Sequence, residues 1–264
     1  MNLYMPRFYV RDLAGNLERM EADVAEADKQ GCFAILFPEM FLTGYQGEND
    51  PQLIRTAFAE ASQAHPELLC LFGAISEAAR AEPGAESLLR NRLWAYRAGK
   101  PIAHYDKVHL FIPNGEHEMW EPGERYVAMS HGSWRVGLMT CNDVRFPEQA
   151  RALKLEHDVN LLACPALWPR ERDHIWAALL RARAIENAVF VAGCCVAGVD
   201  NGVENFDGAG NYVFDPLGEQ VCASERARKP LLSGGVYELD LSRLDDVLVD
   251  TRMQYREISR VELD

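Results

Sequence analysis

Apolar residues recur along the chain at helical spacing in some stretches and in short unbroken runs in others. Four apolar residues before Gly31 lie three or four positions apart, which predicts a helix that ends at this glycine. They are Leu17, Met20, Val24 and Ala27. The same reasoning predicts helices over residues 51–65, 172–187 and 242–251. Buried strands are predicted over residues 34–39, 68–75, 136–140, 159–163, 188–192 and 235–241.

Turn residues add two hairpins to this pattern. Residues 89–96 and 101–105 are strand-like and are joined by a short segment that contains Gly99. Residues 212–214 and 219–222 flank a second turn at 215–218. Strands that alternate with helices and are interrupted by hairpins indicate an α/β fold with mixed sheets. Residues 81–86 are short enough to form an exposed loop, so we expect a single domain over residues 1–264.

Cys141 stands where a strand-like run gives way to a helical stretch that begins near Gln149. We expect a thiol in this place to be exposed at a sharp bend, where the N-terminus of the following helix favours its thiolate. The alternative interpretation of a cysteine is a small buried hydrophobic residue. Cys141 is therefore a candidate nucleophile.

Two other charged residues also follow apolar runs. Glu39 ends the run 34–39, and Lys107 ends the strand-like run that begins at Ile102. In α/β folds, site residues gather where strands give way to loops. An acid, an amine and a thiol are thus candidates for one site, although each alone would be an ordinary loop or surface residue.

With these three segments the chain resembles the nitrilase, or carbon–nitrogen hydrolase, superfamily, in which a Glu, a Lys and a Cys follow in this order. The resemblance makes Glu39, Lys107 and Cys141 a catalytic triad. It also matches Glu116 to the family's second glutamate, which lies a fixed short distance before a Pro-Gly pair, here ending at Gly123. Segments 183–187 and 214–218 extend the resemblance. It implies an α-β-β-α sandwich with two stacked mixed sheets between helical layers.

The chain departs from the family pattern in three places. Cys195 stands where many members have an asparagine, and Leu167 where some members carry one. Ala209 and Gly210 replace a small residue followed by serine. These departures bear on the substrate and leave the triad intact.

The resemblance implies a cofactor-free hydrolase that cleaves the C–N bond of a small amide through a thioester. Cys141 would attack the carbonyl, Glu39 would act as general base, and Lys107 would stabilise the oxyanion. A nitrile hydrolase or an N-carbamoyl amine hydrolase could use the same triad. A catalytically silent scaffold or binding protein is the alternative outside enzymes.

Residues beside the motif segments are candidates for substrate binding. Tyr45, Asn142 and Trp168 flank these segments and are expected to line the pocket. Arg145 either anchors a substrate carboxylate through its bidentate fork or forms an ion pair with Glu148 or Glu186.

Composition limits the partners and the compartment. The net charge of −13 disfavours nucleic acid and anionic membranes. No apolar stretch reaches the roughly 20 residues of a membrane span, and the N-terminus lacks a secretory pattern. Seven cysteines, mostly in apolar runs, fit a reducing cytoplasm. Residues 117–121 match H-E-x-x-H only up to Glu121, and no Gly-rich phosphate loop occurs, so we expect neither a catalytic metal nor a cofactor.

The helical stretches after Cys141 have more apolar positions than one buried face requires. An isologous contact with a second copy would cover the remainder, which predicts a homodimer or a larger homo-oligomer. The residues concerned are Ala150, Leu153, Leu155, Ile175, Trp176, Leu179, Leu180 and Ile185.

Overall fold

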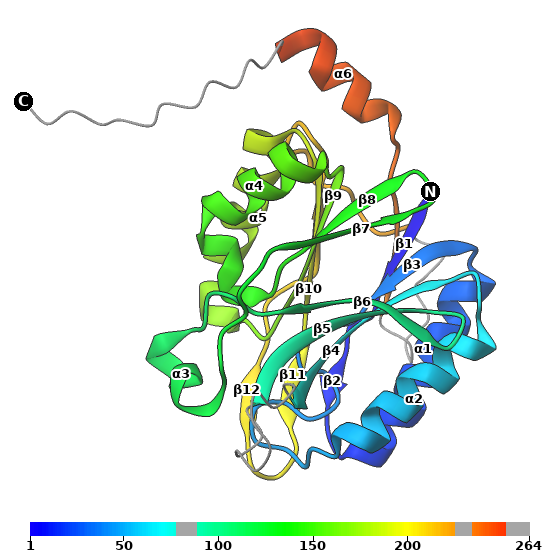
Figure 1. The fold of residues 1–264 in the computed structure, drawn as a ribbon, viewed down its shortest axis with the longest axis vertical. Helices are drawn as coiled ribbons and strands as arrows, with labels where there is room; N and C mark the ends of the chain where they lie inside the picture. The colour runs from blue at the N-terminus through cyan, green and yellow to red at the C-terminus, as the bar shows by residue number, and fades with distance from the viewer. Residues whose placement is uncertain (78–88, 225–233, 252–264) are drawn as a thin grey trace, which may run out of the picture.

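The computed structural model describes residues 1–77, 89–224 and 234–251. Its centre consists of two mixed sheets that face each other (Figure 1). The six-stranded sheet has, in spatial order, β14 (Gly235–Glu238), β1 (Asn2–Met5), β3 (Cys32–Leu36), β4 (Leu69–Glu77), β5 (Leu89–Arg97) and β6 (Lys100–Asp106). The five-stranded sheet has β13 (Tyr212–Phe214), β10 (Phe190–Cys195), β9 (Leu161–Ala166), β8 (Trp134–Leu138) and β7 (Val127–His131).

Helices cover the outer face of each sheet, so the layers run helix, sheet, sheet, helix (Figure 1). Helices α1 (Leu13–Lys29) and α2 (Pro51–Ala64) pack on the six-stranded sheet, and α4 (Pro147–His157) and α5 (Asp173–Asn187) pack on the five-stranded sheet. The expected α-β-β-α sandwich with two mixed sheets is confirmed. A short α3 (Glu116–Met119) and a terminal α6 (Ser242–Thr251) lie outside these layers.

Both sheets have parallel strands at their centre and antiparallel strands at their edges. Strands β1, β3 and β4 run parallel, as do β8, β9 and β10. Such strands are covered on both faces, which explains their unbroken apolar runs. In β9, Leu161 and Ala163 enter the core between the sheets, whereas Leu162 and Cys164 pack toward the helices.

A third, small sheet lies beside the two large ones and is made of β12 (Asn205–Asp207), β11 (Gly198–Asp200) and β2 (Tyr9–Val10). Its hairpin of β11 and β12 holds the segment after β3. Asn201 Nδ2 donates to Thr43 O at 2.9 Å, and Tyr45 N donates to Glu204 Oε2 at 2.9 Å. Residues 40–47 are thereby fixed in place.

Most predicted elements are confirmed, with shifts at their ends. The hairpin of β5 and β6 turns through Ala98 and Gly99, both in the left-handed region with φ of 48° and 75°. The predicted strand 219–222 forms only an isolated bridge between Phe214 and Gln220. Strands β1 and β7 were not predicted, and the expected loop at 81–86 lies outside the described residues.

The apolar residues of α4 and α5 are covered more fully than we expected. Ala150, Leu153, Trp176 and Leu180 are buried against the sheet and the neighbouring helix, so the argument that they need a partner is wrong. The exposed large apolar side chains on these helices are Leu155 and Ile185.

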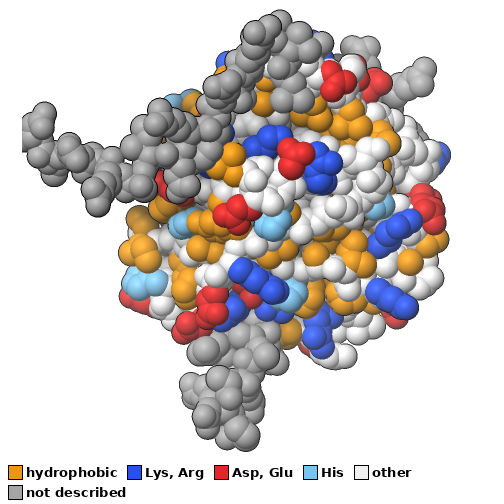
Figure 2. Space-filling view, turned by 45° about the horizontal axis from the view of Figure 1, so that its top comes forward, with side chains coloured by type: hydrophobic (Ala, Val, Ile, Leu, Met, Phe, Trp, Pro, Cys, Tyr) orange, Lys and Arg blue, Asp and Glu red, His pale blue; other side chains and the backbone are white. Residues whose placement is uncertain are grey.

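On the face drawn in Figure 2, basic, acidic and apolar side chains are interspersed, and no large basic area stands out. This mixture agrees with the acidic composition, which disfavours polyanionic partners. None of the described helices has the length and apolar character needed to cross a membrane.

Candidate active site

Glu39 lies in the turn that follows β3, and the backbone there is tightly constrained. The next residue, Met40, adopts a left-handed conformation with φ of 46°. Strand β4 passes so close that a Cβ on Gly73 would lie 2.8 Å from Pro38 O and 3.0 Å from Glu39 Cα. The carboxylate of Glu39 is fully buried and accepts from Asn91 Nδ2 at 2.7 Å. Its position is therefore fixed by backbone packing and by a neighbouring strand.

Lys107 follows directly after β6 and is fully buried. Its Nζ lies 2.9 Å from Glu39 Oε1 and 2.8 Å from Glu116 Oε1. Its backbone N donates to Asn91 O at 2.9 Å, and its backbone O accepts from Gly123 N at 2.8 Å. A Cβ on Gly123 would clash with Asp106 O, which gives a steric reason for glycine in the Pro-Gly pair.

Glu116 is the first residue of α3 and is the glutamate of its acidic segment that reaches the site. Its Oε2 accepts from Phe111 N at 2.7 Å, and its Oε1 accepts from Tyr45 Oη at 2.6 Å as well as from Lys107. Glu116 is fully buried. The other candidates of this segment, Glu118, Glu121 and Glu124, are exposed.

Cys141 begins a 3₁₀ turn, Cys141–Arg145, after β8 and has a φ of 49°. The sharp bend at this residue is thus confirmed. The expected exposure is wrong, because only 5% of the residue is accessible; the exposed thiol among the described cysteines is Cys222. The turn is held by Asp143, whose carboxylate accepts from Thr140 N at 2.7 Å and from His109 N at 3.0 Å.

Electrostatics at the site favour a neutral thiol beside a charged amine. Burial first, and then the negative charge of Glu39, raises the pKa of Cys141 well above its ordinary value, so the expected thiolate is not favoured. Burial also raises the pKa of Glu39, although Lys107 opposes this shift. Burial alone would lower the pKa of Lys107, but the adjacent carboxylates of Glu39 and Glu116 outweigh it and raise this pKa.

The backbone of Leu167 joins the acid to the thiol. Leu167 follows β9, and its N–H donates to Glu39 Oε2 at 2.7 Å. Its carbonyl accepts from Cys141 Sγ at 3.8 Å. Side chains from both sheets therefore meet on one peptide segment at the edge of the sandwich.

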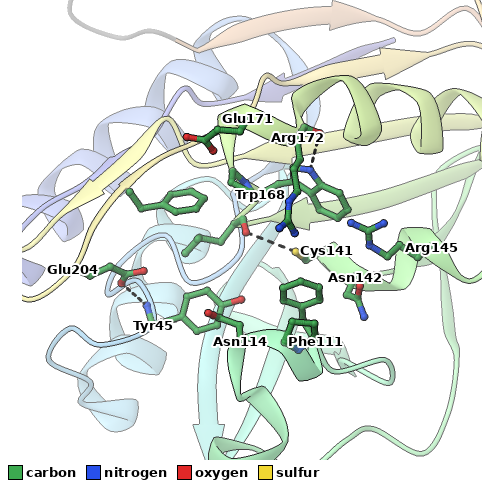
Figure 3. Close-up of a pocket in the computed structure, with 14 residues that line it drawn as sticks. Tyr45, Phe111, Asn114, Cys141, Asn142, Arg145, Trp168, Glu171, Arg172 and Glu204 are labelled. Carbon is green, nitrogen blue, oxygen red and sulfur yellow. Dashed lines mark hydrogen bonds between the residues drawn. The ribbon is translucent and has the colours of Figure 1, made fainter.

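A pocket of about 490 Å³ opens in front of Cys141 (Figure 3). The three residues expected to line it all do so. Tyr45 stacks on Trp120 at a centroid distance of 5.2 Å, Trp168 stacks on Trp176 at 5.2 Å, and Asn142 Nδ2 donates to His109 O at 3.1 Å.

Comparison with known proteins decides the family. A family model described as carbon-nitrogen hydrolase matches residues 3–244. The chain belongs to the carbon-nitrogen hydrolase family. An omega-amidase from Escherichia coli K12, YafV, is 32% identical over 201 residues, which cover 74% of this chain and 73% of that protein. The chain is thus a carbon-nitrogen hydrolase that is similar to an omega-amidase.

Two further proteins are similar to this carbon-nitrogen hydrolase, one in sequence and one in fold. A 2-oxoglutaramate amidase from Paenarthrobacter nicotinovorans is 35% identical over 133 residues, which cover 48% of this chain and 44% of that protein. The crystal structure of Saccharomyces cerevisiae Nit3, a member of the nitrilase superfamily, superposes with a TM-score of 0.80 at 19% identity. That comparison covers 97% of this chain and 96% of Nit3, and it supports the fold.

Two arginines of the carbon-nitrogen hydrolase line its pocket, Arg145 and Arg172. Figure 3 shows both side chains directed toward the part of the pocket where Cys141 lies. Arg145 stacks on the Trp168 ring at 4.6 Å, and its Nε is buried without a hydrogen-bond partner. The ion pair considered for Arg145 is not formed with Glu148 or Glu186, since the described partner of Glu186 is Arg183 at 2.8 Å.

Sequence reasoning missed the residues of the carbon-nitrogen hydrolase that hold the charged groups in place. Asn91 bonds both to Glu39 and to the backbone of Lys107. The sequence contains a signal for Asn91, because it lies two and four positions before the apolar Leu93 and Ala95 and therefore on the same buried face of β5. The contact made by the Leu167 backbone has no such signal, since any residue provides a peptide N–H.

Proposed function

We propose that the chain hydrolyses a small amide through a thioester on Cys141, with Glu39 as general base and Lys107 as the oxyanion donor. The observation that carries the proposal is the buried Lys107, bonded to the carboxylates of both Glu39 and Glu116 beside the Cys141 thiol. An amide carbonyl is a weak electrophile, so its cleavage requires a strong nucleophile, a base and positive charge at the oxygen.

The thiol is neutral at rest, and Glu39 therefore removes its proton as the reaction begins. Sulfur attacks the carbonyl carbon, and the resulting tetrahedral intermediate expels ammonia, which takes the proton from Glu39. A water molecule then gives a proton to Glu39 and attacks the thioester. The C–S bond breaks, the acid product leaves, and the proton returns to Cys141.

Lys107 donates to the oxyanion in both tetrahedral intermediates. An ammonium group has three donors, and two of those on Lys107 are directed at Glu39 and Glu116. The third remains for the substrate oxygen, together with the backbone N–H of Asn142. Glu116 keeps Lys107 charged and oriented, and Tyr45 fixes Glu116 through its hydroxyl.

We infer further that the preferred substrate carries a carboxylate at the end opposite its amide. Arg145 and Arg172 supply two guanidinium groups in one pocket, and neither forms an ion pair with a described carboxylate. A guanidinium group binds a carboxylate through paired donors. The names of the relatives, omega-amidase and 2-oxoglutaramate amidase, support monoamides of dicarboxylic acids as the substrate class.

Succinamate and butyramide provide a matched test, because they differ only in a carboxylate against a methyl group. We expect kcat/KM to favour succinamate by about tenfold or more, the range of a hydrogen bond to a charged group. Arg145→Gln should remove this preference and leave turnover of butyramide close to wild type. Equal turnover of both amides by the wild type would contradict the carboxylate subsite.

Intact mass spectrometry tests the chemistry separately from the substrate class. Exposure to a panel of amides and nitriles, followed by acid quenching, should trap an acyl adduct on Cys141 and on no other thiol. Cys141→Ala should abolish the adduct, whereas Cys222→Ala, which removes the exposed thiol, should leave it unchanged. An adduct that persists in Cys141→Ala would exclude the proposed nucleophile.

We also propose that the protein forms a homodimer or a larger homo-oligomer. The support is narrower than the sequence indicated and rests on the exposed apolar side chains Leu155 of α4, Ile185 of α5 and Leu217. Leu217 lies in the turn beside α5, because a Cβ on Gly218 would be 2.5 Å from the Ile185 side chain. Three exposed apolar residues are thus available on this side of the sandwich.

A further inference from the structure

The segment Leu167–Trp168 lies between the proposed reacting groups and the thiol of Cys195. On one side, Leu167 N bonds to Glu39 Oε2 at 2.7 Å, and Leu167 O bonds to Cys141 Sγ at 3.8 Å. One residue further, Trp168 N donates to Cys195 Sγ at 3.3 Å, and Trp168 O accepts from the same sulfur at 3.5 Å. Consecutive residues of one segment therefore bind the acid, the candidate nucleophile and a second thiol.

We propose that Cys195 is a positioning residue for amide hydrolysis, which fixes the Leu167 peptide against Glu39 and Cys141. The proposal rests on the functions proposed above for those two residues. Cys195 is fully buried at the end of β10 and is not among the residues that line the pocket. It acts on the reaction only through the segment that it holds.

The strand pairing explains why a side chain at this position can hold the segment. Strand β10 runs parallel to β9, and Cys195 lies opposite Ala166, the last residue before Leu167. The backbone of Cys195 is itself fixed, since its N donates to Asn211 Oδ1 at 2.9 Å. The thiol is thus presented from a rigid strand to the residues that follow Ala166.

The two bonds to Cys195 differ in importance. Trp168 O also accepts from Ala209 N at 2.8 Å, so it keeps a partner if the thiol is removed. For Trp168 N, the sulfur of Cys195 is the described partner. A buried N–H without a partner is unfavourable, so the segment would shift to satisfy it. Burial raises the pKa of Cys195 to about 12, which keeps the S–H proton available for its own bond.

Cys194 provides a matched control within the same strand. It is equally buried, but it points to the opposite face of β10, into the core between the sheets. Its sulfur bonds to Pro6 O at 3.8 Å, far along the chain from Leu167 and Trp168. Truncation of either cysteine to alanine removes the same buried sulfur atom, whereas only truncation of Cys195 removes the partner of Trp168 N.

The test compares Cys195→Ala, Cys195→Val, Cys195→Ser and Cys194→Ala in the full chain, with the amide of the panel that the wild type hydrolyses fastest. Valine fills the space of the thiol without a donor or acceptor, so it keeps the strand packed if the alanine variant folds poorly. We expect kcat to fall about tenfold or more in the alanine and valine variants with little change in KM, because a small misplacement of reacting groups is costly.

The pH profile separates positioning from loss of packing. A displaced Leu167 N–H no longer stabilises the Glu39 carboxylate, so the acid limb of kcat/KM should move to higher pH in Cys195→Val. Cys195→Ser should restore most of kcat and the position of the acid limb of the kcat/KM profile. Cys194→Ala should leave that position as in the wild type. A wild-type kcat and limb in Cys195→Val, or the same shift in Cys194→Ala, would overturn the proposal. Activity that survives Cys141→Ala would instead overturn the proposed nucleophile, whatever Cys195 does.

Discussion

At the scale of single residues, the site consists of charges that stabilise one another out of water. Lys107, Glu39 and Glu116 are fully buried, and a buried ion pair is tolerated only when its hydrogen bonds are satisfied. Asn91, Phe111 N, Tyr45 and Leu167 N supply those bonds. The same contacts that make the cluster stable therefore fix its geometry.

The pH dependence follows from the raised pKa values of Glu39 and Cys141. Glu39 must be ionised to act as base, so kcat/KM should fall as the pH decreases through a pKa above the ordinary value of 4.5. An ordinary thiol ionises near pH ~8.5. Because burial raises the pKa of Cys141 above its ordinary value, we expect no gain in kcat/KM in this range. Initial rates over a pH series measure the fall of kcat/KM at low pH and its course through pH ~8.5. A rise through pH ~8.5 would instead indicate attack by a free thiolate.

Lys107→Met tests the oxyanion donor. We expect kcat to decrease by about 10²- to 10³-fold, the usual cost of one lost donor, with a smaller change in KM. The free energy of unfolding should also decrease by about 3–5 kcal/mol, because two buried carboxylates lose their cation. Steady-state kinetics and urea unfolding measure the two effects. Lys100→Met, at the exposed start of β6, the strand that Lys107 follows, is the control. A rise in KM alone would make Lys107 a ground-state substrate anchor.

At the scale of secondary structure elements, the site is built where strands of both sheets end. Glu39 follows β3, Lys107 follows β6, Cys141 follows β8 and Leu167 follows β9. These strand ends are readable from the sequence, because apolar runs stop at them. Polar residues at such ends come together in α/β folds, and this rule makes Glu39, Lys107 and Cys141 candidates for one site. Their assignment as a triad, and the choice of Glu116, came from the resemblance to the family.

Other parts of the site were beyond such reasoning. Cys141 is only 5% accessible although it lines the pocket, and a strand-to-helix junction in the sequence does not determine this burial. The departures at Leu167 and Cys195 could be seen in the sequence, but their mutual link depends on the pairing of β9 with β10. Pairing between distant strands is a property of the folded chain.

Gly73→Ala tests how far the strands themselves set the position of Glu39. The added Cβ would lie 2.8 Å from Pro38 O and 3.0 Å from Glu39 Cα, and backbone atoms cannot move aside cheaply. We expect a loss of about 1–3 kcal/mol in the free energy of unfolding, together with a reduced kcat. Urea unfolding and initial rates measure both. Gly15→Ala, at an exposed position in the first turn of α1, is the control. An unchanged kcat in Gly73→Ala would show that the turn carrying Glu39 accommodates the added Cβ without displacing the carboxylate.

At the scale of the whole molecule, most apolar side chains of the described residues are buried between the sheets or beneath the helices. Leu155, Ile185 and Leu217 are among the exposed ones and lie on the side of α4 and α5. An assembly that uses this side would bury them against a second copy. Such an isologous contact would place two five-stranded sheets on either side of a two-fold axis.

Multi-angle light scattering at low micromolar concentration measures this assembly directly. We expect a mass of at least twice the 29.7 kDa of one chain. Ile185→Asp should shift the mass toward one chain, because burial of an unpaired charge is unfavourable. Ile102→Asp, which changes an exposed isoleucine on β6, should leave the mass unchanged. A wild-type mass of one chain would exclude the oligomer.

The neutral, enclosed thiol of Cys141 has a consequence for survival under oxidative stress. Peroxide reacts with thiolates, and Cys141, although it faces the pocket, has a thiol that is neutral at rest because burial raises its pKa well above the ordinary value. We expect amidase activity to persist in millimolar hydrogen peroxide while the exposed Cys222 is oxidised first, as peptide mapping would reveal. Glu39 forms the Cys141 thiolate only during turnover, so the resting enzyme would be protected from oxidation by peroxide. An enzyme with a permanently ionised cysteine does not have this protection.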